Sequence, residues 1–281
     1  MKKLLSLVVV LILAISGAAM AETETKTYVI GATPSPHAEL LELIKDDMAE
    51  LGYPIEIQIF NDYNLPCPAL AAGDLDANYF AHIPFINAYN ESVPEDQQVV
   101  PAFGVHYEPF GIYSSKYESL DDLPENATVC IPNDPSNQTR ALFLLQDAGL
   151  LTLPEGSTPL DTLNVTDVVE VKNGLQISDI DAAQLPSTLE DKDIAVINGN
   201  YALDAGLSPL NDAIFYEPAD GEAASIYANY VCVRAEDVDA DWVKALQSCL
   251  CSEKTYEFMT ENEAYAGGVI PFFSLDSADE E

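Results

Sequence analysis

The polar segment 133–140 (NDPSNQTR) holds the residues best suited to bind an anion. It follows a β-branched run, residues 128–131, and precedes an apolar, helix-like run that stops at Gly149. A strand, a polar loop and a helix in this order direct free backbone N–H groups and a positive dipole end at one point. Arg140 falls in the first turn of the predicted helix, where its two-pronged guanidinium suits a carboxylate. Two interpretations stay open: Arg140 binds an anionic ligand, or it pairs with one of the many acids on the surface.

Further polar residues stand at or near the ends of predicted strands, where ligands bind in α/β sheets. They are amides and aromatics with one arginine and one histidine, and no nucleophile or paired base is among them. Such an inventory suits a small zwitterion, because arginine binds a carboxylate, amide oxygens accept from an ammonium, and aromatic rings cover an apolar side chain. The residues are Tyr63, His82, Asn133, Asn137, Arg140, Asn200 and Asn229.

Catalytic and metal-binding motifs are missing from the sequence. His37, His82 and His106 show no close ligand spacing, so the sequence predicts no metal site. The chain has neither a G-x-S-x-G nucleophile elbow nor a GxGxxG or phosphate-loop motif. We therefore expect a protein that is not an enzyme, with no catalytic residues and no cofactor.

The composition restricts the partners. The chain has 11 Lys+Arg against 47 Asp+Glu, a formal charge of −36. A surface this acidic repels nucleic acid and anionic membranes, so neither is expected as a partner. The hydrophobic content of 48% favours a folded chain in spite of the charge.

The N-terminus has the pattern of an export signal. Lys2 and Lys3 precede a short apolar run and the small-residue site Ala19-Met20-Ala21, which predicts a signal peptide over residues 1–21. The apolar run is shorter than the roughly 20 residues of a membrane span. No cysteine follows the cleavage site, so we expect an extracytoplasmic protein, periplasmic or at the cell surface, without a lipid anchor.

Strand and helix patterns alternate along the mature chain. Residues 26–31 and 55–60 are predicted strands, and apolar residues at helical spacing fill the stretch between them. In an extended segment 77–82, Asn78, Phe80 and His82 share one face and Tyr79 takes the other. The same alternation resumes at residue 128, which predicts two α/β lobes with short crossings.

Four motifs in this order resemble the NlpA/MetQ family, the methionine-binding proteins of bacterial ABC importers, and the resemblance covers nearly all of the mature chain. They are GATPSPHAE (31–39), DLDANYFAHIP (74–84), HYEP (106–109) and IPNDPSN with RAL (131–142). The resemblance implies a type II periplasmic-binding-protein fold with the ligand in the cleft between two α/β lobes. We expect residues 27–108 plus 229–281 to form lobe 1 and residues 109–228 to form lobe 2.

The resemblance also implies a function and a set of ligand-binding residues. The chain would be a monomeric extracytoplasmic receptor that binds L-methionine and delivers it to the permease and ATPase of an ABC importer. Arg140, with Asn137 beside it, would bind the carboxylate, and Asn200 and Asn229 match further asparagines of the family. The thioether pocket would be lined by aromatic and histidine side chains: Tyr63, Phe80 and His82, with Tyr79 and His106 close by.

Two departures from the family pattern leave the ligand and the function less narrowly defined. The family usually carries a lipid-anchored cysteine after the leader, and residues 64–68 (NLPCP) replace a more polar run. The second departure affects the pocket near Tyr63, so D-methionine or a methionine-containing dipeptide are alternative ligands. Two hypotheses from different classes are an enzyme on the same fold, which would have to use His82 or Cys67, and an interaction protein with a vestigial cleft.

Overall fold

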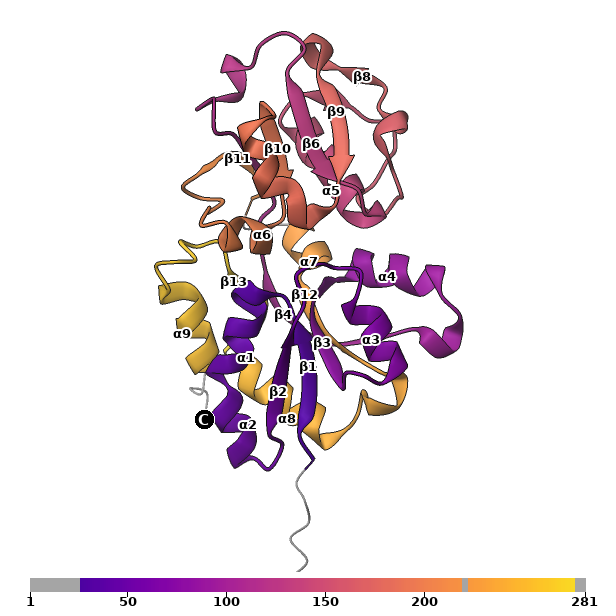
Figure 1. Cartoon of the computed structure of the whole chain (residues 1–281), viewed down its shortest axis with the longest axis vertical. Helices are drawn as coiled ribbons and strands as arrows, with labels where there is room; N and C mark the ends of the chain where they lie inside the picture. Colours follow the sequence, from indigo (N-terminus) through magenta and orange to yellow (C-terminus); the bar gives the residue numbers. More distant parts are fainter. Residues whose placement is uncertain (1–25, 219–221, 276–281) are drawn as a thin grey trace, which may run out of the picture.

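The computed structural model describes residues 26–218 and 222–275, which form two lobes, one above the other in Figure 1. The predicted leader and the acidic end from Asp276 lie outside these ranges. Across the two described stretches, the helices are too short or too polar for any of them to span a bilayer.

Lobe 1 is built on a six-stranded sheet in the order β13-β4-β12-β3-β1-β2. β1 runs parallel to β2 and β3, whereas β12 runs antiparallel to β3 and β4. The strands are β1 (Tyr28–Ala32), β2 (Ile55–Ile59), β3 (Ala77–His82), β4 (Val100–Tyr107), β12 (Asn229–Val233) and β13 (Ile270–Pro271).

Helices cover both faces of this sheet, which is why β3 is buried along its whole length. Tyr79 belongs to the core that includes residues of α1, α2, α8 and α9, and Phe80 to the core that includes residues of α3 and α4. The predicted alternation of these two side chains is thus confirmed. The helices are α1 (Glu39–Leu43), α2 (Lys45–Glu50), α3 (Pro66–Ala72), α4 (Ile83–Ser92), α8 (Asp241–Leu250) and α9 (Glu253–Glu261).

Lobe 2 has a five-stranded sheet in the order β11-β5-β10-β6-β9, with a small β7-β8 ribbon beside it. β6 lies parallel to β9 and β10, and α5 packs against it. The elements are β5 (Gly111–Tyr113), β6 (Thr128–Pro132), α5 (Pro135–Asp147), β7 (Leu151–Thr152), β8 (Glu170–Val171), β9 (Gln176–Ile180), β10 (Ile194–Ile197), α6 (Gly199–Asp204) and β11 (Ala213–Tyr216).

Two crossings join the lobes and meet each other. The chain passes from β4 to β5 through residues 108–110 and returns from β11 to β12 through the segment with α7 (Glu222–Tyr227). The Glu217 N–H donates to the Phe110 carbonyl oxygen over 2.9 Å, so the outward and return crossings are hydrogen-bonded at the boundary between the lobes.

The strand, loop and helix predicted around Arg140 are present as β6 and α5. Asp134 caps the helix by accepting from the Asn137 N–H, and Pro135 occupies the first turn, where a missing N–H costs nothing. Because α5 already begins at Pro135, Arg140 lies in the second turn and not in the first. Its side chain is therefore beyond the free N–H groups of the helix end.

Candidate functional site

A pocket lies between the two lobes and receives residues from both. Lobe 1 contributes the loop after β2, the β3–α4 junction and the start of β12; lobe 2 contributes α5 and the start of α6. Its lining residues are Tyr63, Phe80, Ala81, His82, Phe85, Glu108, Asn137, Arg140, Asn198, Gly199, Asn200 and Asn229.

His82 ends β3 and caps α4, which fixes its ring at the cleft. Its Nδ1 accepts from the Phe85 N–H over 3.2 Å, so the proton is on Nε2, which donates to Asn137 Oδ1 over 3.0 Å. Burial, with help from the Arg140 charge, lowers the pKa of His82 to about 3. His82 is therefore a neutral ring that links the lobes, and both of its nitrogens are occupied.

The Asn137 side chain belongs to the same hydrogen-bond network. Its Oδ1 accepts from His82 and from Asn198 Nδ2, and its Nδ2 donates to both carboxylate oxygens of Asp134 over 2.9 and 3.0 Å. The side chain thus holds its neighbours in place, and its amide oxygen and nitrogen are both engaged before any ligand is bound.

The start of α6 presents two polar atoms without a hydrogen-bond partner in the described part of the chain. Asn200 Oδ1 accepts from the Tyr63 hydroxyl, which leaves the Asn200 Nδ2 donor unpaired. Asn198 Nδ2 donates to Asn137 over 3.0 Å, which leaves the Asn198 Oδ1 acceptor unpaired. Leaving a buried polar atom unpaired costs about 1–3 kcal/mol. One free donor and one free acceptor in a single pocket fit a ligand with both kinds of group.

Arg140 forms a buried ion pair inside the chain. Its Nε and Nη2 donate to the two carboxylate oxygens of Glu217 over 2.9 and 2.5 Å, and Nη2 also donates to the Glu108 carbonyl oxygen over 2.9 Å. Burial opposes its charge, but Glu217, with Tyr107 and Tyr227, outweighs burial, and the pKa of Arg140 is raised. Arg140 thus pairs with an acid, but this acid is buried on the return crossing and does not lie on the surface, as the second interpretation expected.

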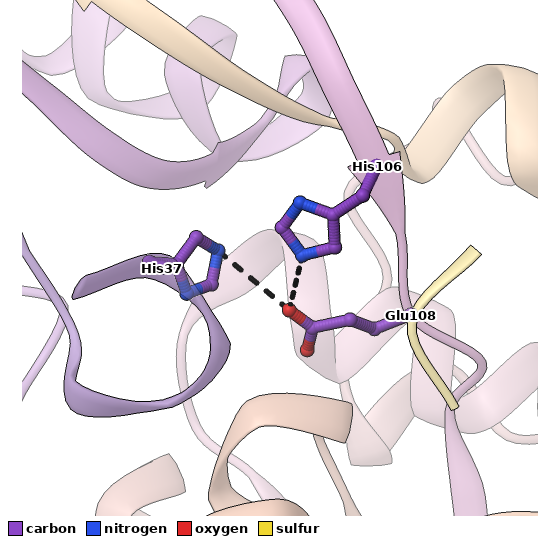
Figure 2. Close-up of side chains that lie close together, drawn as sticks. All are labelled: His37, His106 and Glu108. Carbon is purple, nitrogen blue, oxygen red and sulfur yellow. Dashed lines mark hydrogen bonds and ion pairs between the residues drawn. The ribbon is translucent and has the colours of Figure 1, made fainter. Parts of the chain in front are cut away.

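Glu108 brings a second buried carboxylate to the pocket. Its Oε1 accepts from His106 Nε2 over 2.7 Å and lies 3.6 Å from His37 Nε2, as Figure 2 shows. Burial raises its pKa, while His37, Arg140 and the backbone of Asn200 lower it by less. No arginine or lysine faces this carboxylate with an ion pair among the described residues, which distinguishes it from Glu217.

Three aromatic rings form part of the pocket lining. The ring of Tyr63 lies 5.7 Å from that of Phe80 and 5.8 Å from that of Phe85, between ring centres, and Phe80 lies 5.4 Å from Phe85. These distances are typical of edge-to-face and offset aromatic pairs. The pocket lining therefore combines polar side chains with aromatic rings.

Seven of the nine predicted site residues line this pocket, and two stand behind it. Tyr79 hydrogen-bonds through its hydroxyl to His106 Nδ1, and neither side chain lines the pocket. The residues that the sequence analysis missed are Ala81, Phe85, Glu108, Asn198 and Gly199. Glu108 lies in the HYEP motif and Asn198 and Gly199 precede Asn200 directly, so local signals existed for these three.

The fold and the pocket define a two-lobed α/β binding protein with a small-molecule site between its lobes. The NlpA lipoprotein family model matches residues 28–273. The chain belongs to the NlpA lipoprotein family.

Relatives with names and structures agree with this assignment. The Methionine-binding lipoprotein MetQ of Bacillus subtilis is 36% identical over 255 residues, covering 89% of this chain and 90% of its own. The D-methionine-binding lipoprotein MetQ of Escherichia coli K12 is 37% identical and covers 87% of each chain. A nutrient-binding protein of Burkholderia cenocepacia, solved bound to methionine, superposes with a TM-score of 0.82 at 39% identity, covering 88% of this chain and all of its own.

Proposed function

We propose that the chain binds L-methionine in the pocket between its lobes and delivers it to the permease and ATPase of an ABC importer. The methionine bound to a similar structure supports this ligand, and so do the names of the relatives. The observation that carries the proposal is the pocket itself. Its lining combines an unpaired amide donor and an unpaired amide acceptor with aromatic rings.

In this proposal, the two ends of the ligand headgroup meet different residues. The ammonium binds at the Glu108 carboxylate, with Asn198 Oδ1 and Asn229 beside it. The ligand carboxylate accepts from Asn200 Nδ2 and from Nη1 of Arg140. The ligand side chain packs against Tyr63, Phe80 and Phe85, and His82 lines the pocket next to these rings.

The charges around the pocket favour this orientation. Glu217 already neutralises Arg140, whereas Glu108 has no permanently charged partner. An ammonium therefore gains more from the site than a carboxylate does, since its partner is an uncompensated charge in a medium of low dielectric. Within this site, Tyr79 and His106 act indirectly, by orienting Glu108.

We propose further that the chain is a monomeric binding protein with no catalytic activity. The side chains that an enzyme would need are unsuited to chemistry here. Both nitrogens of His82 are occupied, and burial raises the pKa of the Cys67 thiol to about 12, so the reactive thiolate is scarce at neutral pH. The exported location and the cleavage after Ala21 are part of the same proposal, with the lobe boundaries at residues 108–109 and 228–229.

Calorimetry on ligand-free mature protein tests the proposal. L-Methionine should bind one per chain, and Glu, Lys and Arg should bind weakly, because a charged side chain would be stranded among aromatic rings. D-Methionine and a methionine-containing dipeptide test the alternative ligands in the same experiment. Mass spectrometry of the molecule released by denaturing freshly purified protein gives an independent answer. A preference for a charged amino acid would refute the proposal.

A further inference from the structure

Three side chains with metal-binding atoms meet in a buried cluster (Figure 2), and one of them, Glu108, also lines the pocket. His37 comes from the turn after β1, and His106 and Glu108 come from the end of β4 and the crossing that follows. Their ligand atoms all lie within 4.8 Å of one another, and the residues are only 1%, 0% and 5% exposed. His37 is 69 and 71 positions from the two others in sequence, which is why spacing alone predicted no metal site.

The Nε2 atom of His37 is buried and has no hydrogen-bond partner in the described ranges. Its other nitrogen, Nδ1, is 2.8 Å from the Thr33 hydroxyl. If Nδ1 holds the proton, the Nε2 lone pair faces the Glu108 carboxylate, and two acceptors oppose each other. If Nε2 holds it, the proton points at an oxygen 3.6 Å away, too far for a good hydrogen bond. A cation between Nε2 and the carboxylate would satisfy both groups.

The outer partners of the two histidines resemble those of metal-bound imidazoles. Metal-bound histidines almost always use their second nitrogen for a hydrogen bond that fixes the ring. The Thr33 hydroxyl is the hydrogen-bond partner of His37 Nδ1, and the Tyr79 hydroxyl is the hydrogen-bond partner of His106 Nδ1. Both arrangements direct Nε2 towards the same carboxylate oxygen.

We propose that His37 Nε2, His106 Nε2 and Glu108 Oε1 bind one divalent transition-metal ion, with Zn²⁺ the best fit. Two imidazoles and one carboxylate are a common ligand set for zinc. Bonds of about 2.0–2.2 Å in a tetrahedron place ligand atoms about 3.3 Å apart. The 3.6 Å contact is near that value, and the 2.7 Å contact widens when the ion replaces the shared proton. Water takes the fourth position.

The proposed ion site and the pocket use different oxygens of Glu108. Oε1 faces the two histidines, whereas Oε2 lies beside Gly199, where an added Cβ would be only 2.7 Å away. Glu108 lines the pocket, so an ion reaches the site through the cleft. The ion and the ligand ammonium would both draw on the single charge of Glu108. Metal binding is therefore measured without methionine, which keeps its outcome separate from that of the proposed function.

Cobalt provides a spectroscopic test on the mature chain. Protein stripped with a chelator is titrated with Co²⁺ in excess Mg²⁺ and salt, which occupy the surface carboxylates. We expect one equivalent of Co²⁺ with the intense visible bands of four- or five-coordination, displaced by one equivalent of Zn²⁺. His37→Gln and Glu108→Gln should each abolish these bands, and His82→Gln should keep them, because His82 lies outside the cluster.

Two results would overturn the proposal. One is a weak, six-coordinate cobalt spectrum in the wild-type protein, which marks surface carboxylates only. The other is an intense spectrum that persists in a folded His37→Gln protein, with folding checked by its melting curve. If that variant does not fold, the wild-type stoichiometry and spectrum and the Glu108→Gln protein still decide the question.

Discussion

Two buried carboxylates lie near the cleft, and their surroundings differ. Glu217 receives two hydrogen bonds from Arg140, one from the Tyr107 hydroxyl at 2.8 Å and one from the Phe110 N–H at 2.9 Å. Glu108 has one neutral histidine within hydrogen-bond distance of its side chain and a second one 3.6 Å away.

This difference indicates two separate roles. Both carboxylate oxygens of Glu217 have hydrogen-bond partners within the chain. These contacts join Arg140 to both crossings, so Glu217 helps to fix the position of one lobe relative to the other. No arginine or lysine among the described residues forms an ion pair with the Glu108 carboxylate, which lines the pocket and can bind a cationic group. An arginine at a cleft therefore does not by itself mark the strongest ligand contact, because its own partner has to be considered first.

Removing Arg140 from its pair with Glu217 should have the largest effect, and this effect is on the stability of the fold. Arg140→Ala leaves the buried Glu217 without its counter-charge, and such a loss typically costs about 3–5 kcal/mol. We expect the free energy of unfolding, from urea denaturation, to fall by this amount. The double variant Arg140→Met/Glu217→Leu should recover most of the loss, because no buried charge is then left unpaired. Wild-type stability in Arg140→Ala would contradict the structural role.

A change at Glu108 should lower the affinity for methionine and leave the stability of the fold nearly unchanged. Glu108→Gln keeps the shape and an oxygen for the His106 N–H, but it removes the charge that we assign to the ammonium. Methionine affinity should fall by about 2–5 kcal/mol, roughly 30-fold to several thousand-fold by calorimetry, with little change in stability. Glu125→Gln, at an exposed acid, is the matched control and should bind normally. Equal affinities in the two variants would place the ammonium elsewhere.

The buried histidines should make stability depend on pH. Burial lowers the pKa of His106 to about 3, below its unfolded value of 6.5, so its contribution is complete above pH 6.5 and is lost as pH falls towards 3. At pH 5 the loss is about 2 kcal/mol for one such histidine. Buried acids with raised pKa, such as Glu108 and Asp134, act in the other direction.

The comparison of wild type with His106→Gln isolates the histidine. Urea denaturation at pH 7 and pH 5, in the presence of a chelator, should show that the variant loses about 2 kcal/mol less than wild type on acidification. The same pH dependence in both proteins would show that His106 is protonated in the folded state at pH 5.

Asn198 and Asn200, each with one unpaired amide atom, should give the smallest effects. Asn200→Ala and Asn198→Ala each remove one hydrogen bond to a charged group of the ligand, so we expect affinity to fall by about 1.5 kcal/mol, roughly tenfold. Asn211→Ala, on the surface of the same lobe, should bind as wild type does. Unchanged calorimetric affinity in both pocket variants would mean that these atoms face water and not the ligand.

The sequence predicted the local parts of this site better than its long-range contacts. The β6–α5 unit and the β3–α4 junction at His82 follow from short-range patterns and caps, and both are present. The partner of Arg140 is 77 residues away in the chain, so no local pattern could identify Glu217 among so many acids.

The meeting of His37 with His106 has the same origin. It requires β1 and β4 to enter one sheet with β3 and β12 between them, an order that spacing along the chain does not reveal. The short contacts of Glu108 likewise depend on the crossing between the lobes, where the chain leaves regular structure.

The structure of the mature protein crystallised with L-methionine tests the different roles of the two carboxylates most directly. We predict that the ligand ammonium lies within hydrogen-bond distance of Glu108 and Asn198, and that the ligand carboxylate lies near Asn200 and Nη1 of Arg140. We also predict that the bond between Arg140 and Glu217 stays intact. A ligand carboxylate that displaces Glu217 from Arg140, with the ammonium away from Glu108, would contradict this assignment.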